Sequence, residues 1–199
     1  MRLTEKVHTI LTNHLHEGDL AIDATAGNGY DTLLLAEQVG PSGKVIAIDI
    51  QDCAIRSTRE KLESTGLIDR VKLVTDDHSA ALGKLIEANR EKIAAITFNL
   101  GYLPGSDKSI QTRSESTDEA LAASIQLLSP GGYLCVTAYR GHSGGIAEAE
   151  TVEAFMRKSQ TEGHAVDCHE PESSNSPPIL WVLKTVSYTH LRAHETLLS

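Results

Sequence analysis

The chain has 199 residues, 40% hydrophobic and 23% charged, which suffices for one hydrophobic core and does not favour a second domain. Its formal net charge of -9 at pH 7 excludes a protein that binds nucleic acid mainly by neutralising phosphates, although a local basic patch is compatible with it. Because no apolar run approaches the roughly 20 residues of a membrane helix and no signal peptide is recognisable, we expect a cytoplasmic protein without membrane segments.

The first predicted element is an amphipathic helix that ends near Gly18, because apolar residues recur at helical spacing from Leu3 to Leu15. Apolar runs then alternate with segments of helical spacing. Strands are predicted at 19–25, 44–50, 70–75, 93–99, 132–139, 164–170 and 177–185. Helices are predicted at 30–39, 54–64, 79–90, 117–128 and 146–160.

This alternation predicts an α/β fold, a Rossmann-like doubly wound sheet of seven strands with helices on both faces. The sheet is expected to be parallel except for an antiparallel last strand, because 164–170 and 177–185 leave no room for a helix between them. We assign residues 1–185 to this single domain, with ligands bound at the carboxyl ends of the strands.

Residues 186–199 continue none of these patterns, and we expect a non-native or disordered tail. A short C-terminal helix is the alternative. Its His190 and His194 lie four residues apart but have no third ligand nearby, so no metal site is predicted. Cys53, Cys135 and Cys168 form no C-x-x-C pair, and we expect reduced cysteines in the core.

The first strand runs into "DATAGNGYDT", residues 23–32, where Gly27 and Gly29 form a G-x-G turn into a helix. Such a turn brings backbone N–H groups close to a ligand. Asp49 ends the second strand 22 residues after Gly27, near the about 20 residues expected for a carboxylate that binds ribose hydroxyls. The pair predicts an adenosine-containing ligand, and two ordinary strand ends are the alternative.

Asp23, the G-x-G turn, Asp49, "DDH" at 76–78 and Asn99 together resemble the class I S-adenosylmethionine-dependent methyltransferases. More closely, "DATAGNGYDT", "DIQ", "FNLGYLPGSDK" and "YRGHSGGIAEAE" resemble the bacterial rRNA methylase group, from about residue 5 to 185. Its characterised members methylate the amine of 5-aminomethyl-2-thiouridine at the tRNA wobble position. Tyr30 and Ser106 depart from the pattern, where the family has more often His and usually Gly.

The resemblance implies S-adenosyl-L-methionine as the cofactor and tRNA as a transient substrate, and it leaves a homodimer open. It implies these cofactor-binding residues: Asp23, Ala26, Gly27, Asn28, Gly29, Asp31, Thr32, Asp49, Gln51, Asp77, His78 and Asn99. Asp31 and Thr32 have an alternative explanation, because acids and hydroxyls are favoured at helix starts anyway.

The segment "NLGYLPGSDK", residues 99–108, ends a predicted strand with the N-x-x-Y spacing of the Asn-Pro-Pro-Tyr motif of amino-methyltransferases, which it resembles. Asn99 is then expected to orient the acceptor amine and Tyr102 to stack or hydrogen-bond. Asp107 and His142 are candidates for the general base. Alternatively, Asp107 pairs with Lys108 and His142 is an ordinary loop histidine.

Lys108, Arg113 and Arg140 are the basic residues expected to meet RNA phosphates, with a solvated surface as the alternative. Ser116 to Glu119 match a capping box at a helix start.

The sequence therefore predicts an N-methyltransferase that acts on tRNA by direct in-line displacement, because the rim motifs contain no nucleophilic cysteine. Methylation of rRNA or of a small-molecule amine is an alternative, and so is a non-catalytic module that binds an adenosine ligand such as NAD.

Overall fold

The computed structural model describes residues 2–88, 92–101, 112–171 and 177–186. The strands of these residues are β1 (Leu20–Asp23), β2 (Lys44–Asp49), β3 (Val71–Thr75), β4 (Ile93–Leu100), β5 (Leu128–Ala138), β6 (Ala165–His169) and β7 (Ile179–Lys184). The helices are α1 (Leu3–His14), α2 (Tyr30–Gln38), α3 (Asp52–Thr65), α4 (His78–Glu87), α5 (Ser114–Leu127) and α6 (Gly145–Thr161), with a 3₁₀ turn, η1, at Ile68–Arg70.

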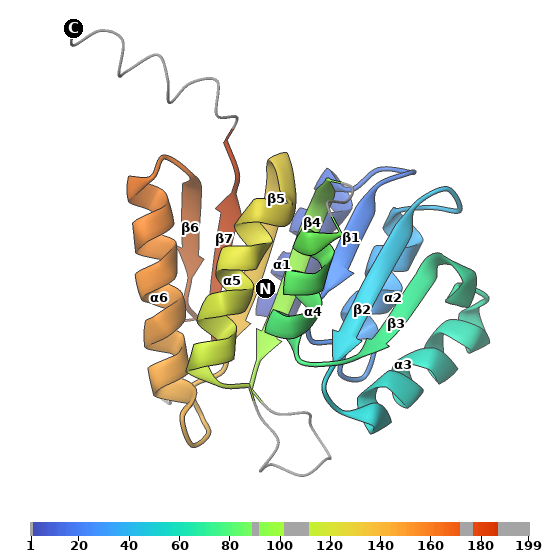
Figure 1. The fold of residues 1–199 in the computed structure, drawn as a ribbon, viewed down its shortest axis with the longest axis horizontal. Helices are drawn as coiled ribbons and strands as arrows, with labels where there is room; N and C mark the ends of the chain where they lie inside the picture. Colours follow the sequence, from blue (N-terminus) through green and yellow to red (C-terminus); the bar gives the residue numbers. More distant parts are fainter. Residues whose placement is uncertain (1, 89–91, 102–111, 172–176, 187–199) are drawn as a thin grey trace, which may run out of the picture.

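These strands form one sheet in the order β3-β2-β1-β4-β5-β7-β6 (Figure 1). Neighbouring strands from β3 to β5 are parallel, whereas β7 runs antiparallel to both β5 and β6. The predicted fold class, including the single reversed strand, is confirmed.

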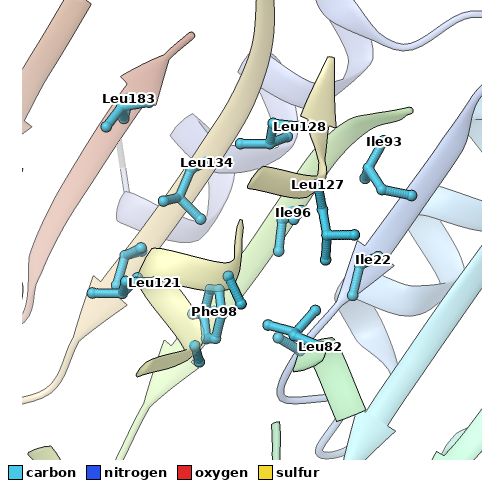
Figure 2. Packing of buried hydrophobic residues seen from close by; sticks show 14 of the residues in the cluster. Ile22, Leu82, Ile93, Ile96, Phe98, Leu121, Leu127, Leu128, Leu134 and Leu183 are labelled. Atoms are coloured by element: carbon cyan, nitrogen blue, oxygen red, sulfur yellow. The ribbon is translucent and has the colours of Figure 1, made fainter. Parts of the chain in front are cut away.

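Every described strand except β6 contributes residues to two hydrophobic cores, because successive side chains of a strand point to opposite faces. Ile22, Ile96 and Leu134 face α4, α5 and α6, which lie in front of the sheet in Figure 1. Figure 2 shows this core closing around Phe98, with Leu82 of α4 and Leu121 of α5 beside it. Burial of each such side chain contributes about 1.5–3 kcal/mol.

The residues next to these in the strands point to the opposite face of the sheet. Ala21, Ala95 and Cys135 pack with Leu11 of α1 and Leu35 of α2, and Leu62 of α3 belongs to the same cluster. Both faces of the central strands are therefore covered, which explains why their sequences read as continuous apolar runs.

The strand register brings the predicted site residues to one edge. Asp23 pairs with Thr97 of β4, two residues before Asn99, and Asn99 pairs with Thr137 of β5. The arrowheads of β2, β4 and β5 point to this edge, the lower one in Figure 1. We call this edge the carboxyl rim.

Two local predictions were wrong. Helix α5 begins at Ser114 with Arg113 as its N-cap residue, so Ser116 lies inside the helix and forms no capping box. The Ser116 hydroxyl instead lies 3.3 Å from the His78 Nε2 atom. Of the three cysteines only Cys135 is buried, and Cys53 and Cys168 are exposed, because their positions fall on solvent-facing sides of α3 and β6.

Candidate active site at the carboxyl rim

Asp23, at the end of β1, holds the first turn of the site together. It is fully buried, and its two carboxyl oxygens accept hydrogen bonds from the Thr32 hydroxyl at 2.6 Å and the Thr25 backbone N–H at 3.2 Å. Burial, with the neighbouring charges of Asp31 and Asp49, raises the pKa of Asp23 to about 7. The carboxyl group therefore titrates near neutral pH.

Asp49, at the end of β2, contacts the same turn from the neighbouring strand. Its carboxylate accepts the Gly27 backbone N–H at 2.9 Å and the Gln51 backbone N–H at 2.9 Å. Burial raises the pKa of Asp49, and these two hydrogen bonds oppose the rise. Gly27 and Asp49, which lie 22 residues apart and were predicted to bind the same ligand, are thus joined by a hydrogen bond.

Gly29 is required by helix packing as well as by the turn. Its φ angle is 76°, and a Cβ atom there would lie 2.9 Å from the Thr58 Cα atom of α3. The sequence suggested only that glycine admits a ligand; the structure adds the close approach of α3. Ala26 N–H donates to the Ile48 carbonyl, which fixes the turn against β2.

Asp77 and His78, which follow β3, both have partners within the protein. The Asp77 carboxylate caps α4 by accepting the Ser79 and Ala80 N–H groups. His78 is buried against the Phe98 ring, and burial lowers the pKa of its imidazole. Their predicted contact with a cofactor stays a prediction, and each has a structural role that accounts for its position.

Asn99, near the end of β4, joins the turn after β1. Its backbone N–H donates to the Thr25 hydroxyl at 2.6 Å, and its side-chain Nδ2 donates to Asp31 Oδ2 at 2.7 Å. Asp31 lies in the first turn of α2, and its other oxygen lies 2.6 Å from the His8 Nε2 atom. His8 and Thr25 were not predicted as site residues from the sequence.

His142, after β5, lies on the same rim as Asn99. A Cβ atom at Gly145 would lie 2.8 Å from its Nε2 atom, and one at Gly101 would lie 3.5 Å away. The imidazole therefore sits between these two glycines, and its Nδ1 atom lies 3.0 Å from the Ser143 carbonyl. Gly101 follows Asn99 by two residues, so His142 lies at the end of β4, and its role as a base stays a prediction.

Gly101 and Thr112 lie side by side, because the Thr112 N–H donates to the Gly101 carbonyl at 3.0 Å. The predicted residues Tyr102, Asp107 and Lys108 lie outside the described residues. Arg140 is held by the Pro177 carbonyl and by the Glu170 carboxylate. Its guanidinium is thus engaged by the β6–β7 connection, which weakens the prediction that it meets RNA phosphates.

The rim also carries apolar surface. In the described part of the chain the large hydrophobic side chains that are exposed are Tyr30, Ile50, Tyr139 and Ile146. Each follows the carboxyl end of a strand or begins the next helix. Exposed apolar side chains beside carboxylates suit a ligand with planar rings and a cationic group.

Within residues 2–88, 92–101, 112–171 and 177–186, no group of three His, Cys, Asp or Glu side chains is arranged to hold a metal ion. None of the helices described there is long and apolar enough to cross a membrane.

Residues 45–184 match the family model described as "Putative rRNA methylase", and residues 3–83 match that of protein-L-isoaspartate(D-aspartate) O-methyltransferase. The first match covers most of the chain. The chain belongs to the rRNA methylase family. The methyltransferase family that the motifs predicted is therefore confirmed.

Two solved structures resemble the chain over nearly its whole length. A "putative rRNA-methylase" from Clostridium thermocellum is 38% identical with a TM-score of 0.86, and the match covers 92% of this chain and 97% of that one. A "putative methyltransferase" from Streptococcus mutans, in complex with S-adenosylhomocysteine, is 34% identical with a TM-score of 0.82, and the match covers 94% of this chain and 99% of that one.

Among curated relatives, the chloroplastic tRNA (mnm(5)s(2)U34)-methyltransferase of Arabidopsis thaliana is 42% identical over 162 residues. That match covers 77% of this chain and 58% of the relative. The ubiquinone/menaquinone C-methyltransferase of a Marinomonas species is 30% identical, with 66% of this chain and 47% of the relative covered. The chain thus spans less than two thirds of these relatives.

Proposed function

We propose that this protein transfers the methyl group of S-adenosylmethionine to the aminomethyl nitrogen of 5-aminomethyl-2-thiouridine at the wobble position of tRNA. The observation that carries the proposal is the side-chain amide of Asn99, held by Asp31 beside the turn that Asp49 anchors. In this proposal the domain is residues 1–185, the protein acts in the cytoplasm and its contact with tRNA is transient.

The cofactor is assigned to the turn between β1 and α2. Asp49 offers its remaining lone pairs to the ribose hydroxyls, and exposed Ile50 offers apolar surface to the adenine. Asp23 and Asp49 place two carboxyl groups around the turn, which suits the sulfonium and ammonium groups of the cofactor. The bound S-adenosylhomocysteine of the Streptococcus mutans relative supports this assignment.

The reaction needs an amine lone pair in line with the sulfonium methyl, about 3 Å away. An amide oxygen at the end of β4 that accepts an N–H of the amine turns the lone pair away from itself and toward the methyl group. We assign this role to Asn99, because its Nδ2 donates to Asp31 and its Oδ1 takes no part in that hydrogen bond. The carbon–nitrogen bond forms as the carbon–sulfur bond breaks, without a covalent enzyme intermediate.

The amine must arrive neutral. An amine with a lysine-like pKa of about 10.4 costs on the order of 4–5 kcal/mol to deprotonate at pH 7, so a base or desolvation aids the reaction. We assign this role to His142, and its position beside Gly101 at the end of β4 supports the assignment. Asp107 is the second candidate for the base.

The test is methyl transfer from labelled S-adenosylmethionine to tRNA that carries unmethylated 5-aminomethyl-2-thiouridine, followed by mass spectrometry of the nucleosides. We expect a wobble nucleoside heavier by one methyl group. In Asn99→Ala, transfer is expected to fall at least about 100-fold while S-adenosylhomocysteine still binds, because the backbone at residue 99 is unchanged.

Other outcomes select the alternatives. Binding of the cofactor without transfer to tRNA would favour rRNA or a small-molecule amine as the acceptor. Of these two, the net charge of -9 favours the small molecule. A calorimetric preference for NAD over S-adenosylhomocysteine would favour a non-catalytic adenosine-binding module and would end the proposal.

A further inference from the structure

Two short hydrogen bonds join three elements at the carboxyl rim. The His8 Nε2 atom of α1 lies 2.6 Å from Asp31 Oδ1, and Asp31 Oδ2 accepts the Asn99 Nδ2 atom of β4 at 2.7 Å. The Asp31 side chain is 12% exposed and that of His8 is 32% exposed. A helix at the start of the chain thereby reaches the residue proposed to orient the acceptor amine.

We propose that His8 and Asp31 form a positioning pair that fixes the Asn99 amide with its nitrogen inward and its oxygen toward the acceptor amine. The inference rests on the proposed function and extends it to two residues outside the N-x-x-Y segment. His8 acts through Asp31, and Asp31 acts through Asn99, so both are positioning residues.

The orientation follows from hydrogen-bond chemistry. An ionised carboxylate only accepts hydrogen bonds, whereas an amide has a donating nitrogen and an accepting oxygen on opposite sides. Asn99 must therefore turn its nitrogen to Asp31, and its oxygen then faces away. A protonated or amidated Asp31 could donate instead, and the amide would lose its preference between the two orientations.

His8 matters because a second acid lies beside Asp31. Asp31 faces His8 of α1, Asn99 of β4 and Asp23 of β1, and its charge raises the pKa of Asp23. The pKa values of Cys135 and Tyr139 on the β5 side are also raised, mainly by burial and secondly by the charge of Asp31. Cys135 and Tyr139 therefore stay neutral near pH 7, and Asp23 is the neighbouring acid whose charge, when ionised, repels that of Asp31.

His8 lies beside these acids, and the hydrogen bond that its Nε2 donates to the Asp31 carboxylate raises the pKa of its imidazole. An imidazolium beside Asp31 favours negative charge on Asp31 and a proton on Asp23. Without His8, the two neighbouring carboxyl groups keep their repulsion and lose this cation, which favours a further proton on the pair. That proton would release the Asn99 amide.

The test compares His8→Leu, His8→Gln and Asp31→Asn with His16→Leu, a histidine that is exposed beyond the same helix. The methyl-transfer rate and the KM for tRNA are measured from pH 6 to 9, and S-adenosylhomocysteine binding is measured by calorimetry. His8→Leu is expected to lower kcat about 10- to 100-fold, with KM and cofactor affinity within about 3-fold of the parent.

The pH profile separates positioning from mere packing. In His8→Gln the amide nitrogen still donates to Asp31 but carries no charge, so we expect most of the rate to return at pH 8.5 and not at pH 6.5. The acidic limb of the profile should thus move to higher pH in both His8 variants. Asp31→Asn should stay slow at every pH, and His16→Leu should match the parent.

Two results would overturn the inference alone: a parent-like rate and pH profile in His8→Leu, or an equal loss of cofactor affinity and rate, which would place the pair in cofactor binding. If the parent protein methylates no tRNA, the proposed function fails instead. The side-chain amide signals of Asn99 in a nitrogen-labelled sample then decide, because the pair predicts that they shift in His8→Leu and Asp31→Asn but not in His16→Leu.

Discussion

Asp49 shows how one carboxylate can serve structure and ligand at once. Its two oxygens accept the backbone N–H groups of Gly27 and Gln51, which fixes the turn after β1 to the start of α3. Each oxygen has a second lone pair, and these remain for ribose hydroxyls. The residue therefore shapes the site before it binds anything.

We predict that Asp49→Asn lowers the affinity for S-adenosylmethionine about 10- to 100-fold. The amide keeps one accepting oxygen but turns an NH₂ group toward the other N–H donor, and a hydrogen bond to a charged group contributes about 1.5–3 kcal/mol. Titration calorimetry measures the change. Asp52→Asn is the matched control, because Asp52 is exposed and pairs only with Arg56 in the described contacts; equal affinities of the two variants would contradict the prediction.

The residues that the sequence predicted at the rim are those whose position follows from a strand end. Asp23, Asp49 and Asn99 each close an apolar run, and parallel strands bring such ends to one edge. His8 lies on a helix and closes no strand, so only the packing of α1 on α2 brings it to Asp31. The partners of Arg140, Glu170 and Pro177, were not predicted for the same reason, since both are distant in sequence.

At the scale of elements, Glu148 connects the first turn of α6 to α5. It is 2% exposed, and its oxygens accept the Thr112 hydroxyl at 2.7 Å and the Thr117 hydroxyl at 2.6 Å. Thr112 also donates its N–H to the Gly101 carbonyl, so Glu148 supports the contact between Thr112 and the end of β4. No strand-end pattern marks this residue, and the sequence analysis assigned it no role.

We predict that Glu148→Ala lowers the free energy of unfolding by about 2–4 kcal/mol, because it leaves two hydroxyl groups without their shared acceptor in a buried place. Urea denaturation followed by circular dichroism measures this value. Glu150→Ala, on the exposed side of the same helix, should change stability by less than about 0.5 kcal/mol. A loss no larger than that of Glu150→Ala would show that Glu148 contributes little.

The order and type of the elements were predictable because each strand is a short apolar run and each helix has a 3.6-residue period. Their ends were less so. The sequence placed the start of a helix at a Ser-x-x-Glu pattern, whereas α5 begins two residues before Ser116. Ser116 is used instead against His78, a contact between α4 and α5 that local sequence does not encode.

At the scale of the whole molecule, the burial of Asp23 in the site makes the free energy of unfolding depend on pH. Asp23 lies fully buried near two other carboxylates, and burial raises its pKa from the usual 3.8 to about 7. The folded state therefore binds a proton more tightly than the unfolded chain. By linkage, the contribution of Asp23 to stability is complete below about pH 4 and is lost as the pH rises through about 7.

This contribution can reach about 4 kcal/mol, at 1.36 kcal/mol for each pKa unit. We predict that the free energy of unfolding of the parent, minus that of Asp23→Asn, falls between pH 4 and 7 and levels off above about pH 8. Urea denaturation at each pH measures the difference. Subtracting the variant removes titrations that both proteins share, such as those of His78 and His169. A difference that is constant with pH would show that Asp23 is ionised throughout.

The bound cofactor should lower the pKa of Asp23, because the cationic groups of the cofactor favour the ionised carboxylate. At pH 6.5, binding of S-adenosylmethionine is therefore expected to release protons, and at pH 8.5 to release almost none from this residue. Calorimetry in two buffers with different ionisation enthalpies measures the number released, and Asp23→Asn removes its part. Proton uptake at pH 6.5 would mean that the ligand's cation does not lie near Asp23, and the carboxylates of the rim would then need another role.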